Sequence, residues 1–418
     1  MSAPDIQSTI LEMGAKARAA TRELVKLTTE KKNTILRAMA KEVRHRQKKI
    51  LDANAKDIAG AESKGLSKPM VDRLRLDADA LEAIASAIED VAALPDPVGE
   101  VLNDWTRPNG LHMRKVRVPI GVIGIIYESR PNVTSDAAVL CFKTGNATIL
   151  RGGSEAIESN RALAEALQKG GETAGLPADS IQLIPFTDRE SVDYMAKMDQ
   201  YLDVIIPRGG KTLIERVVSV ARMPVIKHYH GVCQIYVHSS ANWDMAADII
   251  LNSKCQKPAA CNSVETLLVD KEIAETFYPF IAELLRDKGV EVRGDAAELK
   301  PWPDAKPADW TTEYLDMILA VKTVAGVDEA ITHINRYGSH HTDVIVTDNN
   351  CVAEIFLHEV DSAVVLINAS TRFNDGGEFG FGAEIGISTD KLHARGPMGL
   401  AELCSYKYEV TGSGQVRI

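Results

Sequence analysis

The sequence predicts an α/β protein with two domains that each contain a parallel sheet, and three observations lead to this prediction. Short apolar segments alternate with helical ones from residue 121 onward, a pattern typical of parallel strands covered by helices on both faces. The chain of 418 residues exceeds one ordinary domain of about 100–200 residues. Hydrophobic residues make up 45% of it and charged residues 25%, as in most soluble globular proteins.

The first hundred residues are predicted to be helical. Apolar residues recur at helical spacing from Ile35 to Val43, behind Asn33 as an available N-cap. Gly65 and the Pro-Asp-Pro turn at 95–97 interrupt the pattern. No residue here suggests chemistry, so we expect a helical layer packed on the segments that follow. Further helices are predicted at 50–61 and 78–91.

From residue 111 the pattern changes to that of strands. Residues 111–118 alternate polar and apolar side chains, as an exposed strand does. Ligands of parallel sheets bind beyond the carboxyl ends of the strands, and these ends carry Asn132, Arg151 to Ser154 and Arg208 to Lys211. The buried strands, separated by helices, are predicted at 121–127, 147–151, 181–186, 203–207 and 224–227.

A second alternating block begins at residue 232 and continues through the segment around Cys261. Helices are predicted from Lys271 and from Val327, between strand-like segments at 232–237, 317–322 and 342–347. This alternation indicates a second α/β domain.

Composition excludes several classes of protein. A formal net charge of −10 argues against a nucleic-acid-binding surface, which needs a basic stripe. No apolar run approaches the roughly 18 residues of a membrane span, and the N-terminus lacks a signal-peptide core. The six cysteines are scattered and form no C-x-x-C motif, so we expect reduced thiols in a cytoplasmic protein.

Cys261 lies at the centre of the segment K-P-A-A-C-N-S-V-E-T-L-L-V. Its small neighbours Ala259, Ala260 and Ser263 leave room for a reactant to approach the sulfur. The thiolate is the reactive form, and nearby amides or cations lower the pKa of a thiol from its usual value of about 8.5. A cysteine that only packs as a small hydrophobe is the structural alternative, and the segment alone leaves both open.

The segment R-G-G-K, from Arg208 to Lys211, opens a predicted helix. Gly209 and Gly210 would let the backbone approach a phosphate, and the helix N-terminus supplies amides and a partial positive charge. A simple turn before a helix is an equally good interpretation. Arg151, at the end of a neighbouring predicted strand, favours the anion site.

Asn132 and the histidines each have two interpretations. The amide of Asn132, in R-P-N-V-T, could donate to a developing oxyanion or cap the following helix. The pair His228 and His230 and the pair His340 and His341 lack the helical spacing of zinc-binding histidines, so we expect no metal site. His340 and His341 are instead predicted to line a loop that binds polar groups of a substrate.

With these segments assembled, nearly the whole chain resembles the aldehyde dehydrogenase superfamily, and within it the members that reduce an acyl phosphate of glutamate. The motifs that carry the resemblance are Y-E-S-R-P-N-V-T, C-F-K-T-G-N-A-T-I-L-R-G-G, A-C-N-S-V-E-T-L-L-V, A-I-T-H-I-N-R-Y-G-S-H-H-T-D and L-H-A-R-G-P-M-G-L. The resemblance implies an aldehyde dehydrogenase-like fold: a Rossmann-type cofactor domain, an α/β catalytic domain and a small β flap for oligomerisation.

The same resemblance implies domain boundaries. Residues 1–110 and 121–230 would form the helical layer and the cofactor domain, with part of 362–404 returning to it. Residues 231–361 would form the catalytic domain, and 111–120 with 405–418 the oligomerisation strands.

Site residues follow from the matched motifs. Cys261 matches the nucleophile, and Asn132 matches the amide that forms the oxyanion hole with the backbone N–H of the cysteine. Arg151 stands where a lysine usually approaches the adenosine ribose, and Glu313 matches the glutamate that holds the nicotinamide ribose. The implied cofactor contacts are Arg151, Gly152, Ser154, Arg208, Gly209, Gly210, Lys211 and Glu313. Candidates for holding the substrate are Arg130, His230, His340, His341 and Arg395.

One departure from the superfamily pattern concerns the release of the acyl group. Hydrolytic members carry a glutamate in L-E-L-G-G that activates water, whereas this chain has H-Y-H-G-V-C, with His228 about where that glutamate would be. A thioester without that base has no built-in route to hydrolysis. This departure favours exchange of the acyl group with phosphate.

The resemblance therefore implies NADPH-dependent reduction of L-glutamyl 5-phosphate to L-glutamate 5-semialdehyde, in proline biosynthesis. NADPH is preferred over NADH on the expectation that Arg151, Arg208 and Lys211 face a 2′-phosphate. A γ-glutamyl kinase is a candidate partner, and we expect a homodimer or homotetramer. The alternatives are a CoA-acylating or hydrolytic aldehyde dehydrogenase and, from another class, a non-catalytic scaffold with the same fold.

Overall fold

The computed structural model describes residues 5–294 and 302–417, and the chain forms two compact units. Unit 1 comprises residues 1–227, 380–386 and 398–418, and unit 2 comprises residues 228–379 and 387–397. The sequence predicts a catalytic domain at 231–361. Unit 2 extends further because the chain continues after residue 361 into another strand of the same sheet.

The core of unit 1 is a parallel sheet with the strand order β5-β4-β3-β6. Order reverses at β3, since β4 and β5 extend to one side of it and β6 lies on the other. Every residue of β3 and β4 is buried, as expected for strands covered on both faces. The strands are β3 (Val122–Tyr127), β4 (Ala147–Gly152), β5 (Ile181–Leu183) and β6 (Val204–Arg208).

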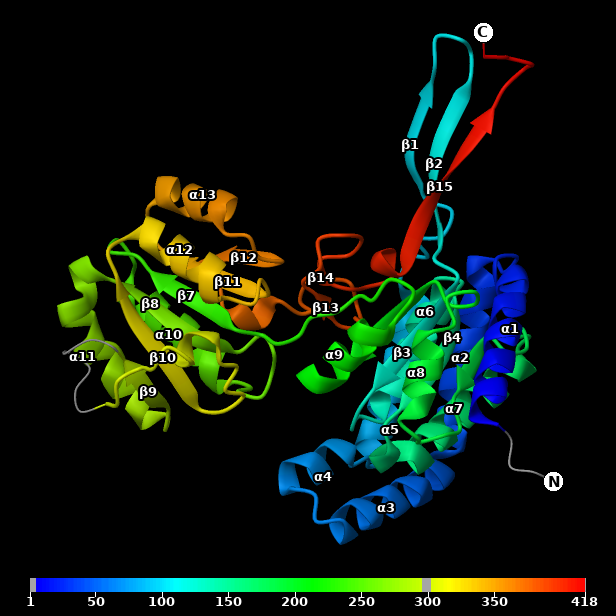
Figure 1. Ribbon diagram of the computed structural model, residues 1–418, viewed down its shortest axis with the longest axis horizontal. Helices are drawn as coiled ribbons and strands as arrows, with labels where there is room; N and C mark the ends of the chain where they lie inside the picture. The colour runs from blue at the N-terminus through cyan, green and yellow to red at the C-terminus, as the bar shows by residue number, and fades with distance from the viewer. Residues whose placement is uncertain (1–4, 295–301, 418) are drawn as a thin grey trace. The chain divides into compact units, whose positions relative to one another are not determined.

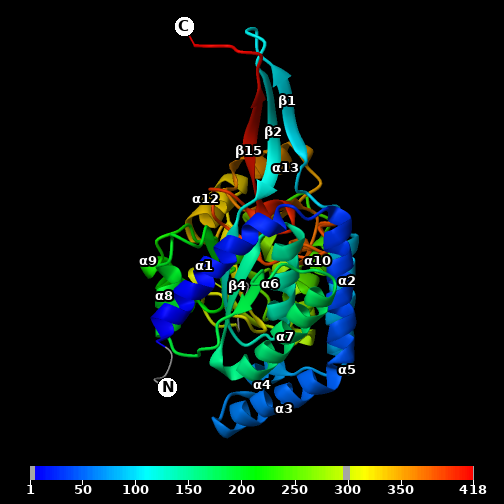
Figure 2. The same cartoon turned by 90° about the vertical axis from the view of Figure 1, so that its right-hand side faces the viewer.

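Helices cover this sheet, and the N-terminal helical layer packs on them (Figure 2). The predicted helix at residues 35–43 is part of α2, which buries the apolar face from Ile35 to Val43 against α5 and α7. Its N-cap is Thr28, whose side chain accepts from the amide of Lys31, rather than Asn33. The helices of unit 1 are α1 (Ile6–Leu24), α2 (Thr29–His45), α3 (Gln47–Ser63), α4 (Lys68–Leu74), α5 (Ala78–Ala93), α6 (Asn132–Lys143), α7 (Ile157–Thr173), α8 (Glu190–Ala196) and α9 (Lys211–Val220).

A three-stranded antiparallel ribbon extends from the rest of unit 1 (Figures 1 and 2). Its order is β1-β2-β15, with bounds of Val101–Thr106, His112–Pro119 and Cys404–Thr411. The sequence predicts two of these strands, at 111–120 and 405–418, and assigns residues 101–106 to the helical layer. The last strand ends at Thr411, before Gly412 and Gly414, and Ile418 lies outside the described residues.

Unit 2 contains a six-stranded parallel sheet with the order β12-β11-β7-β8-β10-β9. Its elements are β7 (Cys233–Val237), α10 (Trp243–Cys255), β8 (Val264–Asp270), α11 (Lys271–Asp287), β9 (Glu291–Gly294), β10 (Ile318–Val324), α12 (Val327–Tyr337), β11 (Thr342–Val346), α13 (Asn350–Glu359), β12 (Val364–Ile367) and the short pair β13 (Ile387–Ser388) and β14 (Gly396–Pro397).

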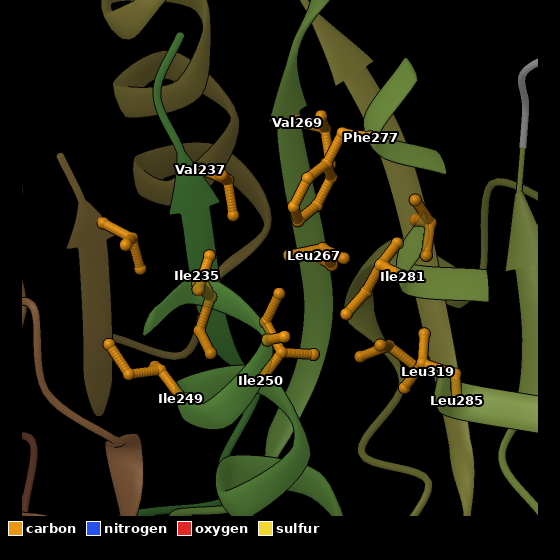
Figure 3. Close-up of a cluster of buried hydrophobic side chains, with 14 of the residues drawn as sticks. Ile235, Val237, Ile249, Ile250, Leu267, Val269, Phe277, Ile281, Leu285 and Leu319 are labelled. Carbon is orange, nitrogen blue, oxygen red and sulfur yellow. The ribbon is translucent and has the colours of Figure 1, made fainter. Parts of the chain in front are cut away.

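Alternate residues of the central strand β7 serve two separate cores. Ile235 and Val237 pack with Ile250 of α10 and Phe277 of α11 on one face, as Figure 3 shows. Tyr236 points to the other face, where it joins a cluster formed with α12 and α13. This double burial explains why neither β7 nor β8 shows the regular alternation of apolar and polar residues that a half-exposed strand has.

Candidate active site

Cys261 lies in the loop between α10 and β8. Two tight turns present it: the amide of Ala260 donates to the carbonyl of Lys257 (3.1 Å), and the amide of Ser263 donates to the carbonyl of Ala260 (2.9 Å). The neighbouring Asn262 is buried and donates its side-chain amide to the carbonyl of Asn374 (3.0 Å). Cys261 itself is half-buried and free. The loop is thus anchored on both sides of a thiol that remains accessible.

The backbone of Cys261 packs directly against Gly231. A side-chain carbon built on Gly231 would lie 1.8 Å from the carbonyl oxygen of Cys261, so only glycine fits there. The Sγ–H of the buried Cys233 donates to the same carbonyl oxygen at 3.3 Å. Glu313 accepts a hydrogen bond from the amide of Gly231 at 2.8 Å. Sequence reasoning did not single out Gly231, although its place in H-Y-H-G-V-C, beside a predicted strand, was visible.

A buried ion pair closes the base of the Cys261 loop. Lys254, near the end of α10, donates to Glu265 of β8 at 2.6 Å and to the carbonyl of Val264 at 3.0 Å. Both charged side chains are fully buried. Burial raises the pKa of Glu265 and lowers the pKa of Lys254, and their mutual hydrogen bond opposes both shifts. The pair therefore fixes the two ends of the loop to each other.

Two imidazole rings lie close to the thiol. One ring nitrogen of His228, one of His341 and the sulfur of Cys261 all lie within 4.8 Å of one another. The Nδ1 of His228 contacts the carbonyl oxygen of Ile387 at 2.8 Å, and the Nδ1 of His341 contacts Thr342 Oγ1 at 2.7 Å. His341 is fully buried, whereas His228 and Cys261 are half-buried.

The other substrate-holding candidates in unit 2 are held partly by Asp361. Its carboxylate pairs with Arg395 at 2.9 Å, and its carbonyl oxygen accepts from both Arg395 (3.1 Å) and His340 (2.5 Å). His340 adopts a left-handed backbone conformation, with φ of 58°. His230 is half-buried in the segment before β7. The structure thus groups Arg395 with His340 and places His341 beside Cys261 instead.

Asn132, in unit 1, is the first residue of α6. The N-cap of that helix is Pro131, and no side chain caps it. The exposed side-chain amide of Asn132 donates instead to Asp136 Oδ2 at 2.9 Å, one turn further along. Burial raises the pKa of Asp136 to about 6. The capping interpretation is therefore wrong, and the oxyanion interpretation stays a prediction. Arg130 is an exposed residue of the preceding turn.

The predicted anion site at the start of α9 already binds a carboxylate. Glu128 follows β3 and accepts from the amide of Gly210 at 2.9 Å. Its carboxylate also fills the space that a β-carbon on Gly209 would need. Arg208 is half-buried, and Lys211 is exposed and lies 3.9 Å from Glu215. The N-terminus of α9 is therefore an effective receptor for a negative group, and a phosphate there would replace Glu128.

Arg151 is buried at the end of β4. It donates to the carbonyl of Thr187 (2.9 Å) and that of Asp188 (3.3 Å) and lies 3.3 Å from Ser191 Oγ. The guanidinium thus binds the turn before α8. Gly152 has no room for a side chain because the amide of Asn160 packs against it, which allows α7 to approach β4 closely.

Ser154 begins a short 3-10 helix (Ser154–Ala156) beside these residues. The carboxylate of Glu155 in that helix accepts from the amide of Ser129 at 2.6 Å. Two carboxylates therefore lie at the turns predicted to bind the cofactor: Glu155 within the turn after β4, and Glu128 against the turn before α9. The sequence analysis assigned neither of them a role.

Comparisons with known proteins place these residues in a family context. A model of the aldehyde dehydrogenase family matches residues 6–316. The chain is 53% identical to γ-glutamyl phosphate reductase of Paramagnetospirillum magneticum, covering 100% of this chain and 99% of the relative. It is 54% identical to the same enzyme of Caldanaerobacter subterraneus, covering 96% and 98%.

Solved structures give the same picture. The crystal structure of γ-glutamyl phosphate reductase from Thermotoga maritima superposes with a TM-score of 0.96 at 46% identity, covering 98% of this chain and 100% of the other. An acetylating aldehyde dehydrogenase from Geobacillus thermoglucosidasius covers 100% of both chains with a TM-score of 0.71 but only 20% identity, so it supports the fold alone. The aldehyde dehydrogenase-like α/β fold predicted from the sequence is confirmed.

Proposed function

The chain belongs to the aldehyde dehydrogenase family, and we propose that it reduces L-glutamyl 5-phosphate to L-glutamate 5-semialdehyde, a step of proline biosynthesis. The observation that carries the proposal is identity above 50% along the whole chain to relatives named for this reaction. An anchored loop with an accessible thiol supports it, because reduction of an acyl group by this family's chemistry requires a cysteine nucleophile.

The proposed reaction begins at Cys261. Its thiolate attacks the γ-carbonyl carbon, the bond from that carbon to the phosphate oxygen breaks, and a thioester remains on the sulfur. The backbone N–H of Cys261 and the side-chain amide of Asn132 are proposed to donate to the oxyanion that forms. After reduction, the carbon–sulfur bond breaks, the semialdehyde leaves and the thiolate is regenerated.

NADPH, when bound, supplies the hydride that reduces the thioester. The reversal of strand order at β3 and β6 marks the edge of the unit 1 sheet where such cofactors bind in α/β folds. The N-terminus of α9 fits a pyrophosphate, since its Gly210 amide already binds the Glu128 carboxylate. Arg208 and Lys211 are proposed to add positive charge there. Preference for NADPH over NADH remains a proposal, and the backbone contacts of Arg151 weaken its assignment to a 2′-phosphate.

The proposed partners follow from the same chemistry. L-glutamyl 5-phosphate is a small, labile acyl phosphate, and we propose a γ-glutamyl kinase as the partner that supplies it. All six cysteines are free, which suits a reducing compartment such as the cytoplasm. No helix in the described part of the chain is long and apolar enough to cross a membrane. We propose a homodimer or homotetramer joined through the β1-β2-β15 ribbon.

A turnover assay tests the proposed function. The purified chain should reduce NADP⁺ when given glutamate-5-semialdehyde and phosphate, and Cys261→Ala should abolish this turnover. Cys255→Ser is the matched control, because Cys255 ends α10, is also half-buried and should leave most of the activity. Mass spectrometry of the enzyme with acyl phosphate but without reduced cofactor should find a glutamyl adduct on Cys261. Equal losses in the two variants, or an adduct elsewhere, would contradict the assignment.

A further inference from the structure

Cys261, His228 and His341 form a group of three metal-binding side chains within unit 2. Their ligand atoms, one sulfur and two ring nitrogens, lie within 4.8 Å of one another. A zinc ion with bonds of about 2.0–2.3 Å holds such ligand atoms about 3.3–3.6 Å apart, so the three need to close by at most about 1.5 Å. Cys261 and His228 lie in loops, and the fully buried His341 directly precedes β11.

Both rings already have the outer contacts that metal-binding histidines have. His228 Nδ1 contacts the carbonyl oxygen of Ile387, which can only accept, so Nδ1 carries the proton and Nε2 carries the lone pair. His341 Nδ1 contacts the hydroxyl oxygen of Thr342, which can either accept or donate a proton. When the hydroxyl accepts, Nε2 of His341 likewise carries the lone pair. Such contacts to a ring's second nitrogen orient the ligand and raise its basicity.

We propose that Cys261, His228 and His341 form an inhibitory binding site for zinc, contrary to the sequence-based expectation of no metal site, because folding brings together one histidine of each pair and the cysteine. A thiolate with two imidazoles is a donor set that zinc favours and that magnesium and calcium, which prefer oxygen ligands, do not. Three protein ligands leave a fourth position for water. On binding, the sulfur releases its proton to solvent and forms a bond to the metal; no electron is transferred.

Zinc at this site removes the nucleophile from the reaction. The lone pair with which the sulfur would attack an acyl carbon is committed to the metal, so turnover stops until a chelator removes the ion. This loss of turnover rests on the proposed function of Cys261, whereas the binding itself does not. The two can therefore be tested separately.

Binding is measured on the full chain with Co²⁺ as a spectroscopic substitute for Zn²⁺. We expect one metal ion per chain, near-ultraviolet absorption from sulfur-to-cobalt charge transfer, and displacement of Co²⁺ by Zn²⁺ but not by Mg²⁺. Cys261→Ser should abolish the absorption. His228→Gln should weaken binding by at least about tenfold, the loss that removal of even an outer contact causes. Cys351→Ser and His358→Gln, which alter exposed residues of α13, are the matched controls. They should change neither the charge-transfer absorption nor the affinity for the metal.

Alkylation of the unmodified chain provides a test that does not depend on the folding of variants. Zn²⁺ should slow the reaction of iodoacetamide with Cys261, followed by mass spectrometry, and leave Cys351 unaffected. Equal rates with and without Zn²⁺, charge-transfer absorption retained in Cys261→Ser, or loss of binding in Cys351→Ser would each overturn the proposal. Zinc bound at Cys261 without loss of NADP⁺ reduction would support the site and contradict the catalytic role of that cysteine.

Discussion

At the scale of single residues, the position of Cys261 depends on the absence of a side chain at Gly231. A β-carbon there would overlap the carbonyl of Cys261, which is also held by the thiol of Cys233. The amide of Gly231 is in turn fixed by Glu313. The reactive loop is thus positioned by contacts to its backbone and not only by its own turns.

Gly231→Ala should therefore lower kcat by about 10²-fold or more, since a displacement of about 1 Å in a reacting group costs that much. The matched control is Gly60→Ala in α3, where an added β-carbon meets no atom within 4 Å. That change should leave kcat unaltered. Steady-state kinetics with circular dichroism of both variants provide the measurement, and an unchanged kcat in Gly231→Ala would show that the loop relaxes without cost.

Asn132→Ala should lower kcat by roughly 10²–10³ with little change in the KM for NADPH, as expected for loss of one oxyanion donor. The contact with Asp136 adds a second variant: Asp136→Ala should release the Asn132 amide and lower kcat. Asp136→Asn should keep most of the kcat that Asp136→Ala loses, because the side-chain oxygen of the new asparagine can still accept the hydrogen bond from Asn132. If Asn132→Ala lowered only the thermal stability and left kcat intact, the role of Asn132 would be structural.

Motifs revealed Cys261 and Asn132, but they could not reveal what surrounds them. Glu128 contacts the Gly210 amide at the start of α9, about eighty positions later, which only folding brings close. Asp136 contacts Asn132 one turn away in the same helix, a contact that depends on where α6 begins. Asn132 at a helix start predicted a cap as readily as an oxyanion donor. The structure excludes the cap, because the N-cap of α6 is Pro131 and the Asn132 amide binds Asp136 instead, while the oxyanion role stays a prediction.

At the scale of elements, two buried titratable groups flank Gln234 of β7. His333 of α12 contacts the side-chain oxygen of Gln234 at 2.9 Å. The carboxylate of Asp343, in β11, accepts a hydrogen bond from the backbone N–H of Gln234 at 3.0 Å. Burial lowers the pKa of His333 to about 4 and raises that of Asp343 to about 7. These groups affect stability in opposite directions as pH changes.

The direction in which each residue changes the stability with pH follows from whether the folded or the unfolded chain binds its proton more tightly. Between pH 6.5 and about 4 the unfolded chain protonates His333 more readily than the folded chain, so this residue makes stability rise with pH. Between pH 3.8 and about 7 the folded chain holds the proton of Asp343, so that residue makes stability fall with rising pH. We expect the two effects to oppose each other over most of this range.

Asp343→Asn removes the effect of Asp343 and keeps that of His333. The free energy of unfolding of this variant, relative to that of the unmodified chain, should therefore increase from pH 4 to 7. His333→Gln should show the reverse trend. Between pH 4 and 7 each change should amount to roughly 3–4 kcal/mol, since one pKa unit corresponds to about 1.4 kcal/mol. Urea unfolding at several pH values in this range measures both, and parallel curves for the two variants would exclude the opposing roles.

The strands of the unit 1 sheet and β7, β10 and β11 of unit 2 were predictable, because buried parallel strands appear as apolar runs between helices. The sequence predicted no strand at β9 or β12, the two edges of the unit 2 sheet. The strand β1 was missed, since its residues are mostly exposed and its pairing with β2 gives no apolar pattern. The predicted strand at 224–227 is only a single bridge between Ile205 and Val225. Short edge segments depend on their neighbours for regular structure, so the local sequence does not determine them.

At the scale of the whole molecule, the proposed release of the acyl group to phosphate would distinguish this enzyme from hydrolytic members of the family. We expect oxidation of the semialdehyde to require phosphate: without it, about one NADPH per active site should form before the thioester accumulates. Stopped-flow absorbance with and without phosphate measures this, and arsenate should restore turnover. Sustained turnover without phosphate would mean that a group such as His228, close to the thiol, activates water.

Exposed aromatic and aliphatic side chains lie on the β1-β2-β15 ribbon, beside Lys115, which stacks on the Tyr406 ring, and we expect this face to contact another subunit. Tyr406, Tyr408 and Val410 alternate along β15, so their side chains share one face, and each is at least 50% exposed. Tyr408→Lys should therefore lower the molar mass measured by light scattering towards that of a monomer. Leu392→Lys, at an 88% exposed position in unit 2, should not. An unchanged mass in both would place the subunit contact elsewhere.

The pairing of β2 with β15 also has a consequence for synthesis of the chain. Arg117 of β2 binds the carbonyl of Ala401, next to β15, 284 positions later. At about 5–20 residues per second, the hairpin of β1 and β2 leaves the ribosome roughly 15–60 s before its third strand. During that interval the edge of β2 is open to neighbouring nascent chains. Its charged residues Arg114, Lys115 and Arg117 are the kind that discourage such pairing, so they protect the chain before folding is complete.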